Sequence, residues 1–220
     1  MRRAMILALV AGVAAMPARA DVRAKNAVRA EDVVFRVTAC LFERDQPKVA
    51  TLLISWPGSV LEFRTMDAMN RRLQMCMPPD SGVYFPRTML RGIVAQQALL
   101  QQFAAWTPLP PLAVDWAREP LANPVAPMGA LHAFARCVVQ AAPEQAHALA
   151  RSARGSAEEG AAVDTMRPAI AGCVPPGRQF AIDRAGLRGL TAEALLAAMN
   201  RGEGAPSPAT LHAEHWPPRD

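Results

Sequence analysis

An internal repeat is the feature that most constrains this chain. Its four cysteines form two pairs, and the members of each pair lie 36 positions apart. When residues 40–100 are aligned without a gap to residues 137–197, an offset of 97, 17 of 61 positions are identical. The sequence therefore predicts two copies of one module of roughly eighty residues. By their numbers in the first copy, the identities are Cys40, Leu52, Ser55, Gly58, Ser59, Glu62, Asp67, Met69, Cys76, Pro78, Pro79, Arg87, Leu90, Arg91, Gly92, Ala95 and Leu99.

Each copy has the pattern of a helical module. A Ser-x-x-Glu capping box occurs twice, as Ser59 with Glu62 and as Ser156 with Glu159. In such a box the hydroxyl and the carboxylate satisfy N–H groups at a helix start. Apolar residues at helical spacing then lead to the second cysteine of the copy, and a Pro-Pro pair stops the helix. We therefore expect an all-α fold of two tandem, pseudo-symmetric helical modules.

Three local features refine this expectation. The last helix of each module is expected to begin near Pro86 or Asp183, which both suit a helix start. Pro168 conflicts with the pattern, because it should kink or shorten the second copy of the long helix. After the Pro-Pro pair, alternating apolar residues favour a short extended segment in each copy, at Val83 and Phe85 and at Phe180 and Ile182.

Four cysteines allow three disulfide pairings. If one module arose first and was then duplicated, each bond should close within a copy, which gives Cys40–Cys76 and Cys137–Cys173. A bond that closes a loop of this length should stabilise the fold by roughly 4 kcal/mol on the chain-entropy model. Free thiols and catalytic redox cysteines are the alternatives. Zinc ligands are disfavoured because no two of these cysteines are closely spaced.

The first twenty residues have the pattern of a Sec-type secretory signal. Two arginines precede an apolar run of thirteen residues, and a small-x-small site predicts cleavage after Ala20. The run is shorter than the roughly twenty residues that span a bilayer, so no membrane span is expected after cleavage. We expect a periplasmic or secreted protein.

The charge of the mature chain argues against nucleic acid as a partner. The whole sequence has 24 Lys and Arg against 19 Asp and Glu, and the signal contains three of the basic residues. The remaining 21 basic residues exceed the acidic ones by two, which gives no global electrostatic case for nucleic acid or an anionic membrane surface.

Composition divides the mature chain further. Residues 104–127 contain six prolines and are expected to form a semi-rigid linker. Residues 201–220 combine prolines and glycines and are expected to be a disordered tail. These boundaries predict a signal at 1–20, module 1 at 21–103, the linker at 104–127, module 2 at 128–200 and the tail at 201–220.

The sharpest shared motif is Arg-x-x-Leu-Arg-Gly. It places Arg87 and Arg91 four residues apart in the first copy, and Arg184 and Arg188 in the second, so each pair lies on one helix face. Cations near a helix start are disfavoured by the helix dipole, which implies specific partners. The first interpretation is ion pairs within the module, with Asp67 and Asp164 as the first candidates and Glu62 and Glu159 as the others. The second interpretation is an anion-binding site of guanidinium groups.

Enzymatic signatures are missing from the sequence. There is no nucleophile elbow, phosphate loop, dinucleotide fingerprint or metal-protease motif, so we expect no catalytic residue, no cofactor and no metal. His132 and His147 have no counterpart in the first copy and are interpreted as ordinary helix residues. The two histidines His212 and His215 lie in the tail, where no fixed second shell would support a metal.

The signal, the cysteine spacing and the Arg-x-x-Leu-Arg-Gly motif together resemble small exported helical proteins of alphaproteobacteria. The resemblance covers both modules and implies a bacterial periplasm, but no activity. We therefore expect a non-enzymatic periplasmic interaction protein that binds an unknown protein partner in the cell envelope. One alternative is an enzyme with its site at the module interface, where polar residues such as His132 and His147 break the repeat. The other is an accessory protein of envelope assembly or stress.

Overall fold

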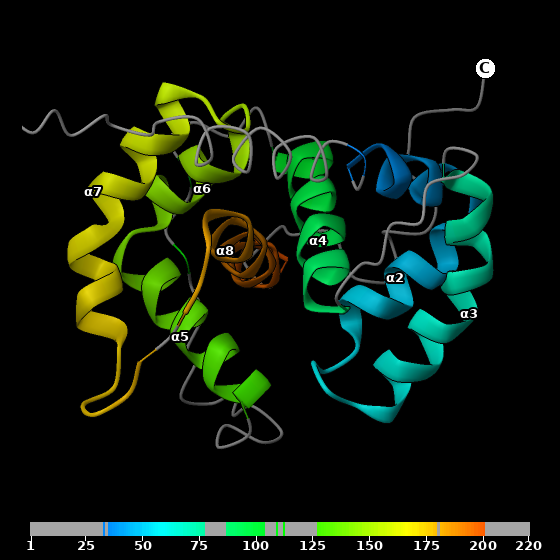
Figure 1. The fold of residues 1–220 in the computed structure, drawn as a ribbon, viewed down its shortest axis with the longest axis horizontal. Coiled ribbons are helices and arrows are strands. Elements are labelled where there is room, and N and C mark those ends of the chain that lie inside the picture. Colours follow the sequence, from blue (N-terminus) through cyan, green and yellow to red (C-terminus); the bar gives the residue numbers. More distant parts are fainter. Residues whose placement is uncertain are drawn as a thin grey trace, which may run out of the picture.

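The computed structural model describes residues 33, 35–77, 87–103, 109, 112, 127–179 and 181–200. These residues form helices joined by turns and loops, with no strand among them, which confirms the all-α fold (Figure 1). Residues 35–44 are helical. The helices that follow are α2 (Gln46–Ile54), α3 (Val60–Cys76), α4 (Arg87–Phe103), α5 (Pro127–Ala141), α6 (Pro143–Arg151), α7 (Ala157–Cys173) and α8 (Arg184–Met199).

The two modules match each other helix by helix. Adding the offset of 97 to the bounds of α2 and α3 gives the bounds of α6 and α7, and α4 shifted in the same way begins at the first residue of α8. The described part of module 1 is residues 33, 35–77 and 87–103, and that of module 2 is residues 128–179 and 181–200. The predicted signal, tail and most of the linker lie outside the described residues, as do Val83, Phe85 and Phe180.

The expected helix starts are present. The hydroxyl of Ser59 accepts a hydrogen bond from the backbone N–H of Glu62 at 3.1 Å, and Ser156 accepts from Glu159 at 3.2 Å. Asp183 caps α8 by accepting from the N–H of Gly186 at 2.8 Å. Pro168 does not shorten its helix: α7 contains 17 residues, which is also the length of α3.

The disulfides are those expected from the repeat. Cys40 is bonded to Cys76 and Cys137 to Cys173, with Cα–Cα distances of 5.8 and 5.7 Å. Each bond joins the first helical segment of a module to the end of its long helix, α3 or α7. The bonds therefore close within the modules.

The two modules meet at α4 and α8, which lie side by side at the centre of the molecule (Figure 1). The helices cross where two glycines face each other: a Cβ on Gly92 would lie 2.7 Å from the Cα of Gly189. Around this crossing a single cluster of buried apolar side chains includes residues of both modules, such as Leu99 and Leu195. The modules thus share one hydrophobic core.

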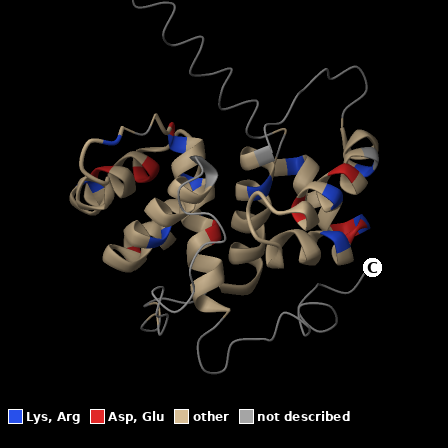
Figure 2. Ribbon diagram, turned by 90° about the horizontal axis from the view of Figure 1, so that it is seen from below, with Lys and Arg blue, Asp and Glu red and all other residues tan. Residues whose placement is uncertain are grey.

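Basic and acidic residues are both found in each half of the described structure (Figure 2). Among the residues described, no helix combines the length and the hydropathy needed to cross a membrane.

Candidate functional site

Arg91 and Arg188 of the repeated motif are buried, with 2% exposure each. Arg91 donates hydrogen bonds to the carbonyl oxygens of Leu52 and Ser55, at 2.7 and 2.8 Å. These carbonyls lie at the C-terminal end of α2, beyond the last regular helical hydrogen bonds; the carbonyl of Leu52 also accepts from the N–H of Ser55 at 3.3 Å. The guanidinium also pairs with Glu62 at 3.2 Å. Arg91 therefore ties the end of α2 to the start of α3.

Arg188 has the same role in module 2. It donates to the carbonyl of Ser152 at 2.8 Å and pairs with Glu159. Both glutamates also bond the residue before the N-cap serine: the second oxygen of each carboxylate accepts from Gly58 N at 2.5 Å or Gly155 N at 2.7 Å. These glycines have φ values of +80° and +72°, which favour glycine. The carboxylates can thus bond an arginine and a helix start at once.

The aspartates named as first candidates are not the partners of the buried arginines Arg91 and Arg188. Asp164 pairs with Arg167, one turn along the exposed side of α7, at 2.8 Å. Asp67 is exposed on α3, and Arg184 is exposed at the first position of α8. The backbone of Arg87 begins α4, but its side chain lies outside the described part of the chain. The structure therefore brings Arg91 to Glu62 and Arg188 to Glu159.

The arginines differ in one partner. Arg91 Nε donates to Glu193 Oε1 of module 2 at 2.6 Å, so its guanidinium lies between two carboxylates. The counterpart of Glu193 in module 1 is Gln96, whose amide donates to the carbonyl of Ala150 instead. As a result, Arg188 Nε is buried without a hydrogen-bond partner among the described residues. The repeat is broken at the module interface.

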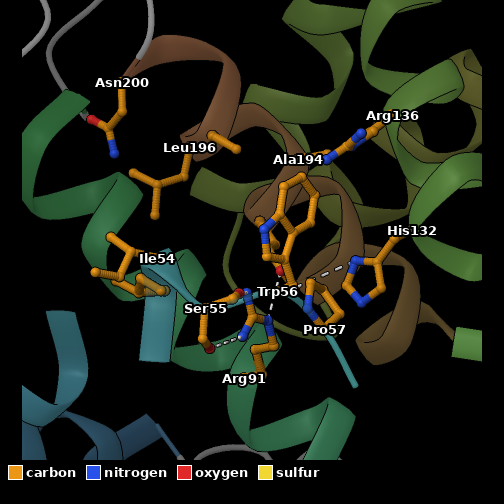
Figure 3. A pocket seen from close by; sticks show the side chains of 13 residues that line it. Ile54, Ser55, Trp56, Pro57, Arg91, His132, Arg136, Ala194, Leu196 and Asn200 are labelled. Atoms are coloured by element: carbon orange, nitrogen blue, oxygen red, sulfur yellow. Dashed lines mark hydrogen bonds and ion pairs between the residues drawn. The ribbon is translucent and has the colours of Figure 1, made fainter. Parts of the chain in front are cut away.

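A cavity of about 350 Å³ opens on this broken side (Figure 3). Its walls come from the end of α2 and from α4 in module 1, and from α5 and α8 in module 2. This is a position between two modules, where ligand pockets are often found, and a volume at the lower end of their range. The lining residues are Leu53, Ile54, Ser55, Trp56, Pro57, Arg91, His132, Arg136, Glu193, Ala194, Leu196, Ala197 and Asn200.

The pocket contains one buried histidine. The Nδ1 atom of His132 lies 3.8 Å from Glu193 Oε2, and its Nε2 atom is buried without a partner in the described structure. Burial lowers the pKa of His132 below its usual 6.5, while the charge of Glu193 partly opposes this shift. We therefore expect a neutral imidazole at pH 7.

Arg136 forms the cationic wall of the pocket. It extends from α5 toward Trp56, and its guanidinium carbon lies 5.8 Å from the centre of the Trp56 ring (Figure 3). Burial lowers the pKa of Arg136, with the charge of Glu193 acting in the opposite direction. Since Glu193 also pairs with Arg91, one carboxylate faces two guanidinium groups.

At the equivalent positions of the other copies, the side chains contact one another. Arg154 lies with its guanidinium carbon 4.6 Å from the centre of the Phe35 ring, and it donates to Gln96 at 3.4 Å. At the corresponding positions the pocket has Pro57 for Arg154, His132 for Phe35 and Glu193 for Gln96. The pocket side therefore has a short ring at Pro57 where the other side has Arg154, and large side chains at Trp56 and Arg136 where the other side has alanines.

A group of exposed apolar side chains borders the pocket. Ile54, Trp56, Val60, Leu61 and Phe63 are exposed by 57, 40, 66, 49 and 39%, and we call them the apolar surface of module 1. The equivalent positions of module 2 are Arg151, Ala153, Ala157, Glu158 and Gly160. The first four of these are exposed as well, but they are charged or small. The two modules therefore differ in the chemistry of this surface.

The chemistry of the pocket suits binding better than nucleophilic catalysis. Ser55 is the hydroxyl residue of its wall, and that hydroxyl donates to the carbonyl of Leu52 at 2.7 Å. Its proton is therefore not offered to a base. Among the described residues, no cluster of His, Cys, Asp or Glu side chains has the arrangement of a metal site.

Sequence reasoning had named only part of this site. His132 was noted as a break in the repeat, but it was interpreted as an ordinary helix residue. His147, the second break, lies apart from the pocket wall and has a backbone hydrogen bond with Phe103. Arg136, Glu193 and Trp56 were missed, although the alignment at offset 97 pairs them with Ala39, Gln96 and Ala153. Such replacements of small or neutral residues by charged or aromatic ones were the available signal.

The chain matches no model of a protein family, no curated protein and no solved structure.

Proposed function

We propose that this chain is a non-enzymatic binding protein of the bacterial periplasm, and that a partner protein of the cell envelope docks on the apolar surface of module 1. The observation that carries the proposal is the contrast between the modules. Ile54, Val60 and Leu61 are among the most exposed large apolar side chains of the described residues, while their counterparts are Arg151, Ala157 and Glu158.

The contrast is informative because Ile54, Trp56, Val60 and Leu61 and their equivalent positions in module 2 are all exposed. Module 2 shows that charged and small residues satisfy this fold at these positions. Moving a large apolar side chain from water to an interior is worth about 1.5–3 kcal/mol. Five such side chains within ten residues, continuous with a pocket, form the kind of patch that marks a protein interaction site. A partner that covers them would gain this free energy.

The chemistry of the partner follows from the charges next to this surface. Within residues 54–67, Glu62 is buried against Arg91, and Arg64 and Asp67 are the exposed charged side chains. Arg64 lies one helical turn from Val60 and Leu61 on α3, so it shares their face. Arg136 lies against Trp56 at the other side. Because the charges beside this surface have both signs, we infer a partner whose contact region is mainly apolar.

An enzyme with its site at the module interface is the second candidate. It is favoured by His132, because an imidazole beside the carboxylate of Glu193 has the arrangement of a general base. The engaged hydroxyl of Ser55 disfavours it. Alanine substitution of His132 and His147 that leaves ligand binding and cellular phenotype unchanged would exclude this candidate.

The proposed docking surface can be tested with a photoreactive amino acid placed at Leu61 or at Glu158, in the cell of origin. These positions are equivalent in the repeat and both are exposed. We expect a cross-linked adduct of higher mass from position 61, absent from position 158. In a chain that also carries Ile54→Arg, the adduct at position 61 should be reduced. Equal adducts from both positions would refute a surface specific to module 1.

A further inference from the structure

We infer that the pocket between the modules binds an uncharged compound that carries an apolar ring and a hydroxyl group, with His132 as the hydrogen-bond partner of the hydroxyl. This site goes beyond the proposed function, although Ile54 and Trp56 border both the pocket and the apolar surface. Its test uses small molecules and does not need the partner protein. The two proposals can therefore fail independently.

The charges around the pocket favour an uncharged ligand. Arg91 pairs with Glu62 at 3.2 Å and with Glu193 at 2.6 Å. Arg136 lies against the ring of Trp56. Burial lowers the pKa of Arg136, and the charge of Glu193 acts against this shift. Two guanidinium groups are thus balanced by two carboxylates. A charged ligand would add a charge without a partner in a partly buried place, which costs free energy.

The group that remains for a ligand is the imidazole of His132, a residue that is only 6% exposed. Its Nε2 atom has no hydrogen-bond partner in the described part of the chain. Its Nδ1 atom lies 3.8 Å from Glu193 Oε2, which is longer than a hydrogen bond. A buried polar atom without a partner costs free energy, and a bond to a ligand would recover it.

The ring of His132 can present this atom to the pocket. It extends from α5 toward Pro57, and both residues line the cavity (Figure 3). The torsion about the bond between Cβ and Cγ has broad preferences in histidine. A rotation about this bond turns Nε2 toward a ligand, and it breaks no hydrogen bond to Glu193 because none is present at 3.8 Å.

A hydroxyl group matches this imidazole in either of its neutral forms. Burial lowers the pKa of His132, with the charge of Glu193 acting in the opposite direction, so the ring is neutral at pH 7. One ring nitrogen then carries a proton and the other accepts a hydrogen bond. A hydroxyl both donates and accepts, so it can bond Nε2 whichever nitrogen carries the proton. A carboxylate only accepts, and an ammonium group only donates.

The repeat shows that the fold does not require polar residues in this wall. At the offset of 97, His132 corresponds to Phe35 and Asn200 to Phe103. Asn200 lines the pocket at the end opposite His132, and its Oδ1 atom is also buried without a partner among the described residues (Figure 3). Module 2 thus has a polar residue with an unpartnered atom at two positions where module 1 has phenylalanine. Both atoms belong to the wall of one pocket, and we attribute them to a ligand.

The other walls are apolar and leave room for a ring. The cavity of about 350 Å³ exceeds the roughly 150 Å³ of a dry protein cavity that binds benzene. A ring would bury its surface against apolar side chains. The hydroxyl can belong to a free small molecule or to a tyrosine side chain, and both present the same group to His132. The apolar lining comes from Leu53, Ile54, Trp56, Leu196 and Ala197.

The site can be tested by NMR titration of the isotope-labelled mature chain with both disulfides formed, with the indole N–H signal of Trp56 as a readout of binding in the pocket. The probes are p-cresol and toluene, which differ only in the hydroxyl group. In a wholly apolar pocket toluene would bind more tightly, because a buried hydroxyl without a partner costs free energy. We expect p-cresol to bind at least about fivefold more tightly than toluene. Equal or tighter binding of toluene would overturn the inference.

Two further probes address the charge and the source of the ligand. The anion p-toluate has a carboxylate in place of the hydroxyl and should bind at least about tenfold more weakly than p-cresol. Equal affinities of these two probes would contradict an uncharged ligand. N-acetyl-tyrosinamide presents the same phenol ring on an amino acid. If it binds as tightly as p-cresol, a tyrosine side chain is assigned as a source of the hydroxyl, and binding of p-cresol alone assigns a free molecule.

Variants of His132 connect the hydroxyl to this residue. In His132→Phe, which has the residue of module 1, p-cresol should lose its advantage over toluene while toluene binds as it does to the native chain. His132→Leu makes the same test if the phenylalanine variant does not fold. His132→Gln should keep the preference for p-cresol, because the glutamine amide both donates and accepts. A preference for p-cresol that persists in a folded His132→Phe or His132→Leu chain would refute the assignment.

His147→Ala is the matched control. His147 is a buried histidine of α6 that lies outside the pocket walls, and Ala50 occupies the equivalent position of module 1. Both affinities should stay within about twofold of those of the native chain. If His147→Ala removes the preference for p-cresol as His132→Phe does, the preference does not come from the pocket and the inference is wrong.

Discussion

Gly92 and Gly189 lie against each other where α4 crosses α8, so closely that a Cβ on Gly189 would lie 2.9 Å from the Cα of Gly92. These residues end the two copies of the Arg-x-x-Leu-Arg-Gly motif. The motif therefore combines two structural roles in consecutive residues. Its second arginine ties the end of one helix to the start of the next within a module, and its glycine lets the two modules approach.

Replacing Gly92 by alanine should destabilise the protein. Alanine is the better helix former by about 1 kcal/mol, but its methyl group would overlap the backbone of α8, and overpacking of this kind typically costs about 1–3 kcal/mol or more. Since the clash is with backbone, we expect a net loss of free energy of unfolding in urea titrations.

Gly160→Ala is the matched control, because Gly160 lies inside α7 with nothing within 4 Å of an added Cβ. It should be neutral or stabilising by up to about 1 kcal/mol. If Gly92→Ala stabilises the chain as much as Gly160→Ala does, the close crossing of α4 and α8 is wrong.

Arg91 and Arg188 should differ in their contribution to stability. Arg91 lies between Glu62 and Glu193, whereas Arg188 pairs with Glu159. Removing one partner of a buried ion pair costs about 3–5 kcal/mol, because the other charge stays buried. We expect Arg91→Met to be more destabilising than Arg188→Met in guanidinium chloride titrations. Equal losses would mean that Glu193 contributes nothing to the pair.

Much of the fold can be predicted from the sequence, because the repeat places structurally important residues, such as the cysteines and the capping residues, at equivalent positions. The capping boxes, the disulfides and the start of α8 required only local rules and the spacing of 97. The ion pairs were harder to assign, because Asp67 and Glu62 lie on the same helix and nothing local separates them. The capping glutamates are the partners of Arg91 and Arg188, because a carboxylate has two oxygens and one of them remains for the arginine.

The pocket could not be predicted because it depends on differences between the copies. Pro57, His132 and Glu193 come from three helices or loops, and only the crossing at the two glycines brings them together. The sequence alone indicates His132 as a break in the repeat, but nothing in it joins His132 to Pro57 and Glu193. The apolar surface is easier to find from the sequence, because Ile54, Leu61 and Phe63 align with residues that are charged or small.

Each disulfide should contribute strongly to stability. Cys40 and Cys76 enclose a loop with a sequence separation of 36. On the chain-entropy model, such a bond stabilises the folded state by about 4 kcal/mol. The double variant Cys40→Ser/Cys76→Ser should therefore lose a comparable free energy of unfolding. The equivalent pair in module 2 serves as the comparison and should lose a similar amount. A loss below about 1 kcal/mol in both would contradict the role of these bonds.

The stability of the protein should fall on mild acidification. Burial lowers the pKa of His132 and of His147 below 6.5. Below about pH 6.5 the unfolded chain binds protons that the folded chain does not bind, so the free energy of unfolding decreases as the pH falls toward the lowered pKa values. Urea titrations at pH 7.5 and 5.5 should show this loss.

The double variant His132→Phe and His147→Ala provides the control, because Phe35 and Ala50 occupy the equivalent positions of module 1. Its loss of stability between pH 7.5 and 5.5 should be smaller than that of the native chain. An equal loss in both proteins would assign the pH dependence to other groups.

The central claim is that the partner docks on module 1 and not on its equivalent in module 2. The partner is first identified from the cross-linked adduct at position 61. The most direct measurement is then the affinity of the purified partner for the native chain and for a variant chain. The variant would carry Ile54→Arg and Leu61→Glu, which are the residues of module 2 at those positions. We predict that this chain keeps its melting temperature and loses at least tenfold in affinity, since about 1.4 kcal/mol of lost burial suffices for that change. Unchanged affinity for the partner in this folded variant would contradict the account.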